Sequence, residues 1–289
     1  MTVSKDVAVK IIDSTLHSDV DTASFDYMKE VAFGFESGGL SEVIRKWHNN
    51  VYIKLHAVNN DGTTTTPNAS DFAELQSIVS ELNELITTID IVLLTGGSSD
   101  ECVSETHAVA SSGTCSTTGY PKPNINLYIT TRSRWATISG QSSGTVSGLN
   151  GQFLVGASST SITSARCWVI SSASEEIRKS LIREEITQPL GFGKDSATHS
   201  DSIFYEDAEA GEFGNNTAFS QLDKNIIRMV YDRRLKGGET VAQAEEILKK
   251  PFAVVSGESY EFNPSKTQKI TVQQNKLDAR FEDNNEFIG

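Results

Sequence analysis

The sequence predicts an α+β fold built on a twisted mixed sheet of four to five strands. Three observations support this prediction. Short apolar runs typical of strands recur along the chain, and they fall at 50–58, 90–97, 124–135 and 165–173. An amphipathic run of helical period, 71–89, separates the first two of them. A second helical run, 174–188, directly follows the last strand, so helices and strands share one core.

The N-terminal half begins with helical sequence over 20–48, which includes a short amphipathic helix at 40–47. The segment 71–89 carries the clearest helical stripe, with apolar residues at the i, i+3, i+4 spacing. Asp71 and Glu74 have the spacing of a capping box at its start. It is therefore expected to be the backing helix of the sheet.

The C-terminal half contains more helix. Residues 137–164 are rich in Ser, Thr and Gly, and their pattern fits loops or short strands equally well. The helix at 174–188 has Ser172 and Glu175 at capping spacing. A third amphipathic helix is expected at 220–235, and a last short helix follows at 239–250, before Pro251.

No Pro-rich linker divides the first 250 residues. The simplest organisation is one domain over 1–250 followed by a C-terminal extension or arm over 251–289. The arm has strand-like patches but no strong pattern of core residues.

Composition limits the classes of function. The formal net charge is −13, and an acidic surface repels phosphates, so nucleic acid is not an expected partner. No apolar run approaches the roughly 18 residues of a membrane span. The N-terminus has no apolar segment of a secretory signal, which predicts synthesis in the cytoplasm. Three cysteines without Cys-x-x-Cys spacing argue against a disulfide scaffold and a cysteine-rich zinc site.

The stretch with the clearest chemical pattern is 183–204, REEITQPLGFGKDSATHSDSIF. Glu184 and Gln188 are four residues apart, so a helix places both side chains on one face. Glu185 lies beside them. Gly191 ends the helix three residues after Gln188, and Asp195 follows the turn.

This pattern resembles the zinc-binding helix of metzincin metallopeptidases, His-Glu-x-x-His-x-x-Gly-x-x-His/Asp. The resemblance implies that Glu184 and Gln188 stand where two zinc-binding histidines would be. It also implies that Glu185 matches the general base and Gly191 the helix-ending glycine. Lys194 has the spacing of the third ligand, and Asp195 is one residue further on.

The resemblance extends on both sides of the helix. Ser202, Ile203 and Phe204 are similar to the Met-containing turn beneath the zinc, with Phe in place of Met. Tyr231 matches the tyrosine of the closing helix in the matrixin branch, and the segment 44–55 resembles the family's opening Lys-Trp and first strand. Residues 25–250 are also similar to an uncharacterised bacterial domain family with a Glu-Glu-x-x-Gln-x-Leu-Gly helix.

The departures from the metzincin pattern predict a degenerate zinc site. A neutral amide at Gln188 is a poor zinc ligand, because zinc prefers His, Cys or carboxylate. Zinc is therefore not expected, whereas the oxygens of Glu184, Gln188 and Asp195 would suit Ca²⁺, Mg²⁺ or Mn²⁺ better. Pro189 also removes a backbone donor from the last turn of the helix.

The alternative is a purely structural role, in which these residues form a buried polar network and Arg183 or Lys194 pairs with a carboxylate. His199 is the one histidine close enough in sequence to join the motif, and a solvated loop histidine is its ordinary interpretation.

Three functional hypotheses follow. The first is a metzincin-like pseudoenzyme that acts in protein binding or assembly, with a peptide held along the edge strand 124–135. The second is an active metal-dependent peptidase with Glu185 as general base. The third is a structural component of a virion or another large assembly. It rests on the acidic Ser/Thr-rich surface and on an arm, 251–289, that would form homo- or hetero-oligomers.

Overall fold

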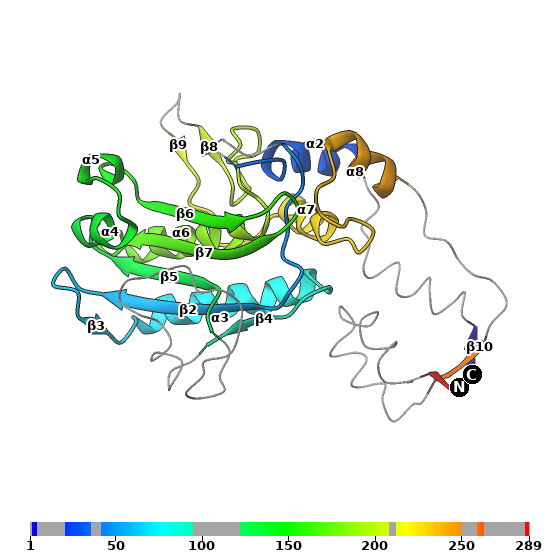
Figure 1. Cartoon of the computed structure of the whole chain (residues 1–289), viewed down its shortest axis with the longest axis horizontal. Helices are drawn as coiled ribbons and strands as arrows, with labels where there is room; N and C mark the ends of the chain where they lie inside the picture. The colour runs from blue at the N-terminus through cyan, green and yellow to red at the C-terminus, as the bar shows by residue number, and fades with distance from the viewer. Residues whose placement is uncertain are drawn as a thin grey trace.

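The computed structural model describes residues 2–4, 21–35, 42–94, 122–207, 212–249, 259–262 and 287–288. At its centre is a twisted sheet of six strands in the order β3-β2-β5-β7-β6, with β4 also paired to β2 (Figure 1). The helices pack on both faces of this sheet. The predicted α+β class with a mixed sheet is confirmed, with six strands instead of four to five.

Parallel pairing forms the middle of the sheet. The strands β2 (Val51–Val58), β5 (Ile125–Thr130) and β7 (Ile162–Ile170) run in the same direction. The short β3 (Thr64–Thr65) is antiparallel to β2, and β4 (Ile91–Leu93) is parallel to it.

The other edge of the sheet is β6 (Gly151–Ala157), which is antiparallel to β7. Among the residues that the structure describes, β7 is the only strand that pairs with β6.

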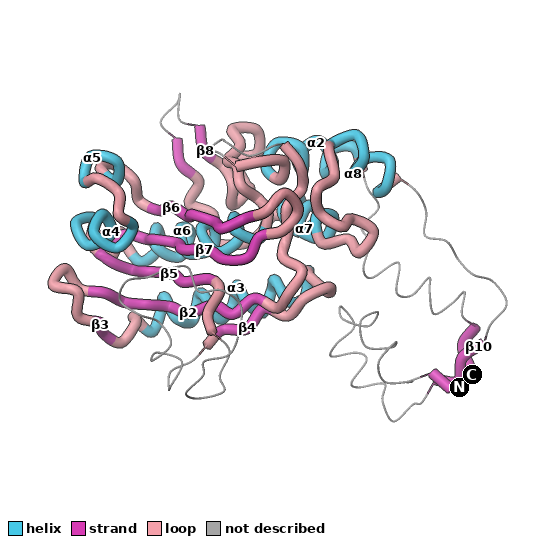
Figure 2. The backbone as a smooth tube through the Cα atoms, viewed as in Figure 1, coloured by secondary structure: helices cyan, strands magenta, loops and turns pink. Residues whose placement is uncertain are grey.

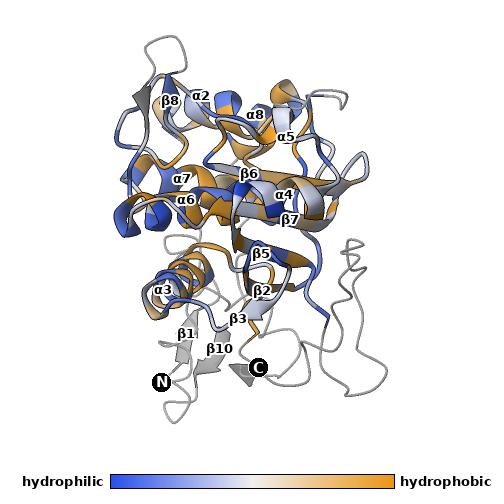
Figure 3. Ribbon diagram, turned by 90° about the vertical axis from the view of Figure 1, so that its left-hand side faces the viewer, coloured by the Kyte–Doolittle hydropathy of each residue, from blue (hydrophilic) through white to orange (hydrophobic). Residues whose placement is uncertain are grey.

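One face of the sheet packs against two helices. The helices α3 (Ala69–Leu85) and α6 (Glu175–Thr187) lie together on this face (Figure 3). Inward residues of neighbouring strands, such as Leu127 and Cys167, are fully buried beneath them. Their alternation with residues of the opposite face follows from the two-residue period of a strand.

The opposite face is covered at one end by α4 (Arg132–Ser139) and α5 (Ser143–Val146). Here the rings of Trp135 and Trp168 are stacked, with centroids 6.1 Å apart, and both side chains are fully buried. Tyr128 stacks on Trp168 from the neighbouring strand. A second, aromatic core therefore fixes α4 to the sheet.

Three helices pack beside the sheet: α2 (Thr22–Val31), α7 (Gln221–Val230) and α8 (Val241–Leu248). Figure 2 shows them grouped at the end of the sheet, with long loops between them. The loop between α6 and α7 contains the short hairpin of β8 (Glu206–Asp207) and β9 (Glu212–Phe213).

Several expected elements differ in the structure. The expected helix at 40–47 is wrong over 42–47, where Ile44 makes an isolated β-bridge to Phe33 and Lys46 makes one to Ser161. The expected strand 124–135 ends at Thr130, and α4 follows it. Tertiary pairing overrides weak local helical preference in the first case.

The expected helix starts also shift. Asn68, not Asp71, caps α3, and its side chain accepts a hydrogen bond from the backbone N–H of Ser70. Ser174, not Ser172, caps α6. In both cases the true cap is the last residue with extended backbone before the helix, which the spacing of polar residues does not reveal.

A separate three-stranded sheet joins β1 (Thr2–Ser4), β10 (Ser259–Phe262) and β11 (Phe287–Ile288). The rest of the expected arm at 251–289 lies outside the described residues, so its role in assembly stays a prediction. No helix in the described part of the chain has the length and apolar character needed to cross a bilayer.

Candidate functional site

The motif helix α6 is fixed at its start by capping and charge. The Ser174 hydroxyl accepts a hydrogen bond from the backbone N–H of Ile177. Glu175 and Glu176 occupy the first turn, where negative charge interacts favourably with the helix dipole. The start of α6 is therefore determined by the cap at Ser174 and by the two acidic residues of the first turn.

The end of α6 is held by two aromatic side chains from distant parts of the chain. The helix continues as a 3₁₀ turn over Gln188–Leu190. The indole N–H of Trp47 donates to the Pro189 carbonyl at 2.8 Å, and the Tyr231 hydroxyl donates to the Leu190 carbonyl at 2.7 Å. These carbonyls would otherwise lack partners at a helix end.

Gly191 makes the turn after this 3₁₀ segment. Its φ is 124°, and a Cβ atom here would lie 2.5 Å from the backbone oxygen of Arg45. Both the positive φ and the close backbone approach require glycine. The turn sends the chain back toward α6 and brings the following loop over Gln188.

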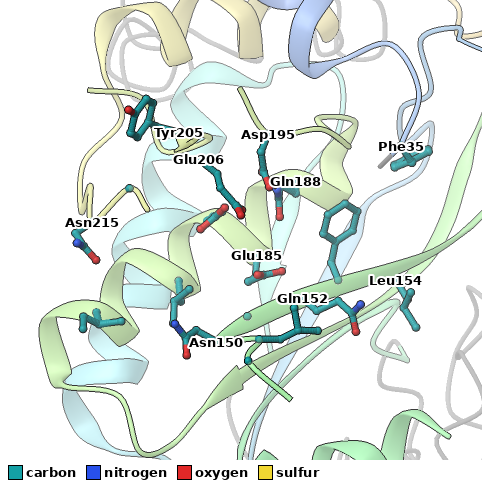
Figure 4. Close-up of a pocket in the computed structure, with 18 of the residues that line it drawn as sticks. Phe35, Asn150, Gln152, Leu154, Glu185, Gln188, Asp195, Tyr205, Glu206 and Asn215 are labelled. Atoms are coloured by element: carbon teal, nitrogen blue, oxygen red, sulfur yellow. Dashed lines mark hydrogen bonds between the residues drawn. The ribbon is translucent and has the colours of Figure 1, made fainter. Parts of the chain in front are cut away.

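A groove of about 520 Å³ opens between the edge strand and α6 (Figure 4). One wall is continuous chain from Gly148 to Val155, which includes most of β6. The other wall is α6 together with the loop that follows it. Phe35 and the β8–β9 region close its ends.

The four polar residues singled out by the motif all line this groove. They are Glu184, Glu185, Gln188 and Asp195. The side-chain amide of Gln188 donates to a carboxylate oxygen of Asp195 at 2.6 Å. Because Gln188 ends α6 and Asp195 follows the Gly191 turn, this hydrogen bond ties the loop to the helix.

Glu185 lies deeper than its neighbour. It is 4% exposed, whereas Glu184 is half-buried. The carboxyl group of Glu185 rests on Gly151 of β6, at the position that a side chain on Gly151 would fill. Glycine in the edge strand thus makes the space in which this carboxylate faces the groove.

The donors present fit zinc poorly. In the described residues no three His, Cys, Asp or Glu side chains converge as a metal-binding group. Glu184 on α6 and Gln188 directly after it supply a carboxylate and an amide, not the nitrogen donors of a metzincin zinc site. The Gln188 amide nitrogen also points to Asp195, so these two proposed oxygen ligands interact with each other.

The positively charged side chains near the motif form ion pairs with carboxylates outside the motif. Arg183 is 2% exposed and pairs with Glu74 at 2.8 Å and Glu81 at 3.0 Å, both on α3. Lys194 pairs with Glu42 at 3.2 Å. In the alternative interpretation Arg183 or Lys194 pairs with a motif carboxylate, whereas the structure pairs Arg183 with α3 and Lys194 with Glu42.

The Ser202–Phe204 turn belongs to the chain that follows Gly191, and all three of its residues are buried. The Ser202 hydroxyl donates to Asp223 of α7 at 2.6 Å and accepts a hydrogen bond from the Tyr27 hydroxyl of α2. Burial raises the pKa of Asp223, while its hydrogen bond from Ser202 opposes that rise. The network joins α2, the turn and α7.

Two aromatic contacts complete this support. The ring of Phe204 stacks on Phe192, which follows Gly191, with centroids 5.4 Å apart. His199 packs edge-on against Tyr27 at 4.8 Å, so its ring contacts the supporting network. The groove-lining residues do not include His199.

Sequence reasoning missed one wall of the groove. The edge strand was expected at 124–135, which is wrong because β5 lies between β2 and β7. The actual edge strand β6 falls in 137–164, where the pattern left strand and loop open. Tyr205 and Glu206 also line the groove and had no motif to mark them.

Comparison with known proteins identifies the family. The model of the family described as "Protein of unknown function (DUF2927)" matches residues 22–250. The chain belongs to the DUF2927 family. This extent agrees with the 25–250 over which the sequence resembles an uncharacterised domain family.

The other comparisons of this DUF2927 chain are weaker. No curated protein matches it. Two solved structures of myroilysin match with TM-scores of 0.32 and 0.34 and identities of 11% and 13%. The matches cover 65% and 75% of this chain and 82% and 98% of the myroilysin chains. At these scores the match does not establish a common fold.

Proposed function

We propose that this domain binds an extended peptide along the edge strand β6, in a groove of metzincin type whose zinc site has lost its histidines. The observation that carries the proposal is that β6 forms one wall of the groove. An antiparallel edge strand presents backbone N–H and C=O groups to which a peptide can add as a further strand. The seven residues of β6 match a peptide of similar length.

The residues on the opposite wall support binding over hydrolysis. Glu184 and Gln188 occupy the positions of the two helix histidines in the metzincin pattern. A glutamine amide that donates to Asp195 at 2.6 Å leaves that pair engaged within the protein. A groove beside a strand edge supports peptide binding, and donors that differ from those of a zinc site argue against hydrolysis.

The proposal is tested by selecting peptides and then probing their backbone. Blocked heptapeptides would be selected against the full chain by phage display. The best binder would then be synthesised with N-methyl groups either at positions 1, 3 and 5 or at positions 2, 4 and 6. A peptide in a strand hydrogen-bonds to one neighbour through alternate residues, so one of the two methylated sets should lose at least tenfold in affinity.

The two methylated peptides are matched controls for each other, because both lose the same number of donors. Equal affinity of both sets, or selection that yields no binder, would overturn strand addition to β6.

A second candidate is a metal-dependent peptidase with Glu185 as general base. It is favoured by one observation, the position of the Glu185 carboxylate in the groove opposite the backbone of β6. Hydrolysis of a selected peptide would be assayed by mass spectrometry with added Zn²⁺, Mn²⁺, Mg²⁺ or Ca²⁺. Turnover abolished by Glu185→Gln would establish this candidate over binding alone, and no turnover with any ion would reject it.

A further inference from the structure

The groove between β6 and α6 has two chemically different halves. Near the start of α6 its lining is aliphatic, with Leu149, Ile177 and Leu181. Ile177 is 37% exposed, although it is a large apolar side chain. Exposed apolar surface beside the outer edge of a sheet is typical of a site that another chain covers.

Near the end of α6 lie the acidic side chains of the groove, together with the rings of Phe35 and Phe153. Four carboxylates face the groove here, and they are Glu184, Glu185, Asp195 and Glu206. The described residues that line the groove include no Lys, Arg or His. A peptide carboxylate in this half would be repelled, and a guanidinium or ammonium group would be attracted.

The spacing of the two halves matches an extended chain. Leu181 precedes Glu184 and Glu185 by three and four residues, which is about 4.5–6 Å along a helix that rises ~1.5 Å per residue. Side chains on one face of a strand recur every two residues, about 6.6 Å apart. An aliphatic and a basic side chain two residues apart would therefore reach both halves.

We infer that the groove selects a segment of a partner protein in which Lys or Arg lies two residues from an aliphatic side chain. This inference rests on the proposed function and adds the chemistry of the peptide. The edge of β6 supplies main-chain hydrogen bonds to the peptide. The acidic and aliphatic halves of the groove determine which peptide side chains bind.

The test uses fluorescein-labelled, blocked heptapeptides on a threonine framework. Each carries one Leu and one variable residue two positions away, in both sequence orders. The variable residue is Arg, citrulline or Glu. Citrulline is the matched control for Arg, because it keeps the shape and most donors of the side chain and removes the charge.

Fluorescence anisotropy with the full chain should show the Arg peptide binding at least tenfold more tightly than the citrulline peptide in one of the two orders. Glu in that position should weaken binding further. The advantage of Arg should fall as salt is raised from 50 to 500 mM, because added ions screen the carboxylates.

Protein variants locate the effect. Glu184→Gln and Glu206→Gln together should remove most of the difference between Arg and citrulline peptides, while the Gln188–Asp195 hydrogen bond is kept. Glu176→Gln is the matched control, since Glu176 is an exposed acid of α6 that does not line the groove. Unchanged thermal unfolding would show that the double variant still folds.

The outcomes separate this inference from the proposed function. Equal binding of Arg and citrulline peptides, with the N-methyl effect intact, would overturn the charge selection and keep peptide binding. Equal binding of the two N-methylated peptides would overturn both the charge selection and peptide binding by strand addition. If the chain self-associates and the peptides compete with that self-association, the occupant of the groove is a second copy of the chain. This result would overturn the inference of a separate partner protein.

Discussion

Lys46 lies in the interior beside the C-terminal end of α7, where its charge is costly. It is 4% exposed, and its Nζ donates to the carbonyls of Val230 at 3.2 Å and Asp232 at 3.0 Å. Burial lowers the pKa of Lys46 to about 8, and the nearby Asp232 opposes that change. The unfolded chain has the ordinary pKa of 10.5.

The pKa difference sets the direction of a pH effect. Between pH 8 and 10.5 the unfolded chain binds more protons at this residue than the folded one does. The free energy of unfolding therefore rises with pH in this window, as Lys46 loses its proton in the folded state. From pH 7.5 to 9.5 the gain is about 2 kcal/mol, at about 1.4 kcal/mol for each unit of pKa difference.

The measurement is urea unfolding followed by tryptophan fluorescence at pH 7.5 and 9.5. It would be made on the unchanged protein and on Lys46→Met. The free energy of unfolding of the unchanged protein minus that of Lys46→Met should increase by about 2 kcal/mol over this range, because only the unchanged protein has the titrating group. Taking the difference cancels other titrating groups, such as the buried thiol of Cys167. A difference that stays constant or shrinks would refute the pKa argument.

Three further predictions concern the core and the turn that shapes the groove. Gly191→Ala should lower the free energy of unfolding by about 2 kcal/mol or more in urea unfolding, because of its positive φ and the nearby Arg45 oxygen; an unchanged value would contradict this. Tyr231→Phe should cost about 1–2 kcal/mol in the same assay, since the buried Leu190 carbonyl loses its donor, and equal stability would argue against that hydrogen bond. Burial raises the pKa of Cys167, so peptide mapping should find it alkylated only at the rate of unfolding. Fast labelling of Cys167 in the folded chain would disprove its burial.

Local pattern was enough to predict most elements of the sheet and its helices. The strands β2, β5 and β7 are buried on both faces or nearly so, and their apolar runs are continuous enough to recognise. α3 has a long amphipathic stripe, and its predicted range differs from the observed one by only a few residues at each end. Boundaries were less accurate because caps depend on backbone conformation.

The edge strand could not be predicted for a physical reason. Every residue of β6 is partly exposed, so no alternation of buried and exposed residues marks it in the sequence. Its Ser/Thr/Gly-rich surroundings resemble a loop. Its pairing with β7 and its position across from α6 are long-range contacts, which local preference does not encode.

The sequence by itself determined the chemical content of the candidate site. The four-residue spacing of Glu184 and Gln188 places them on one helix face, and Gly191 marks the turn after them. Only the tertiary structure decided what these side chains face. Trp47 and Tyr231, far away in the chain, hold the end of α6 so that the loop returns and Asp195 meets Gln188. Packing between distant segments sets that geometry, and it is what brings β6 opposite the motif to form a groove.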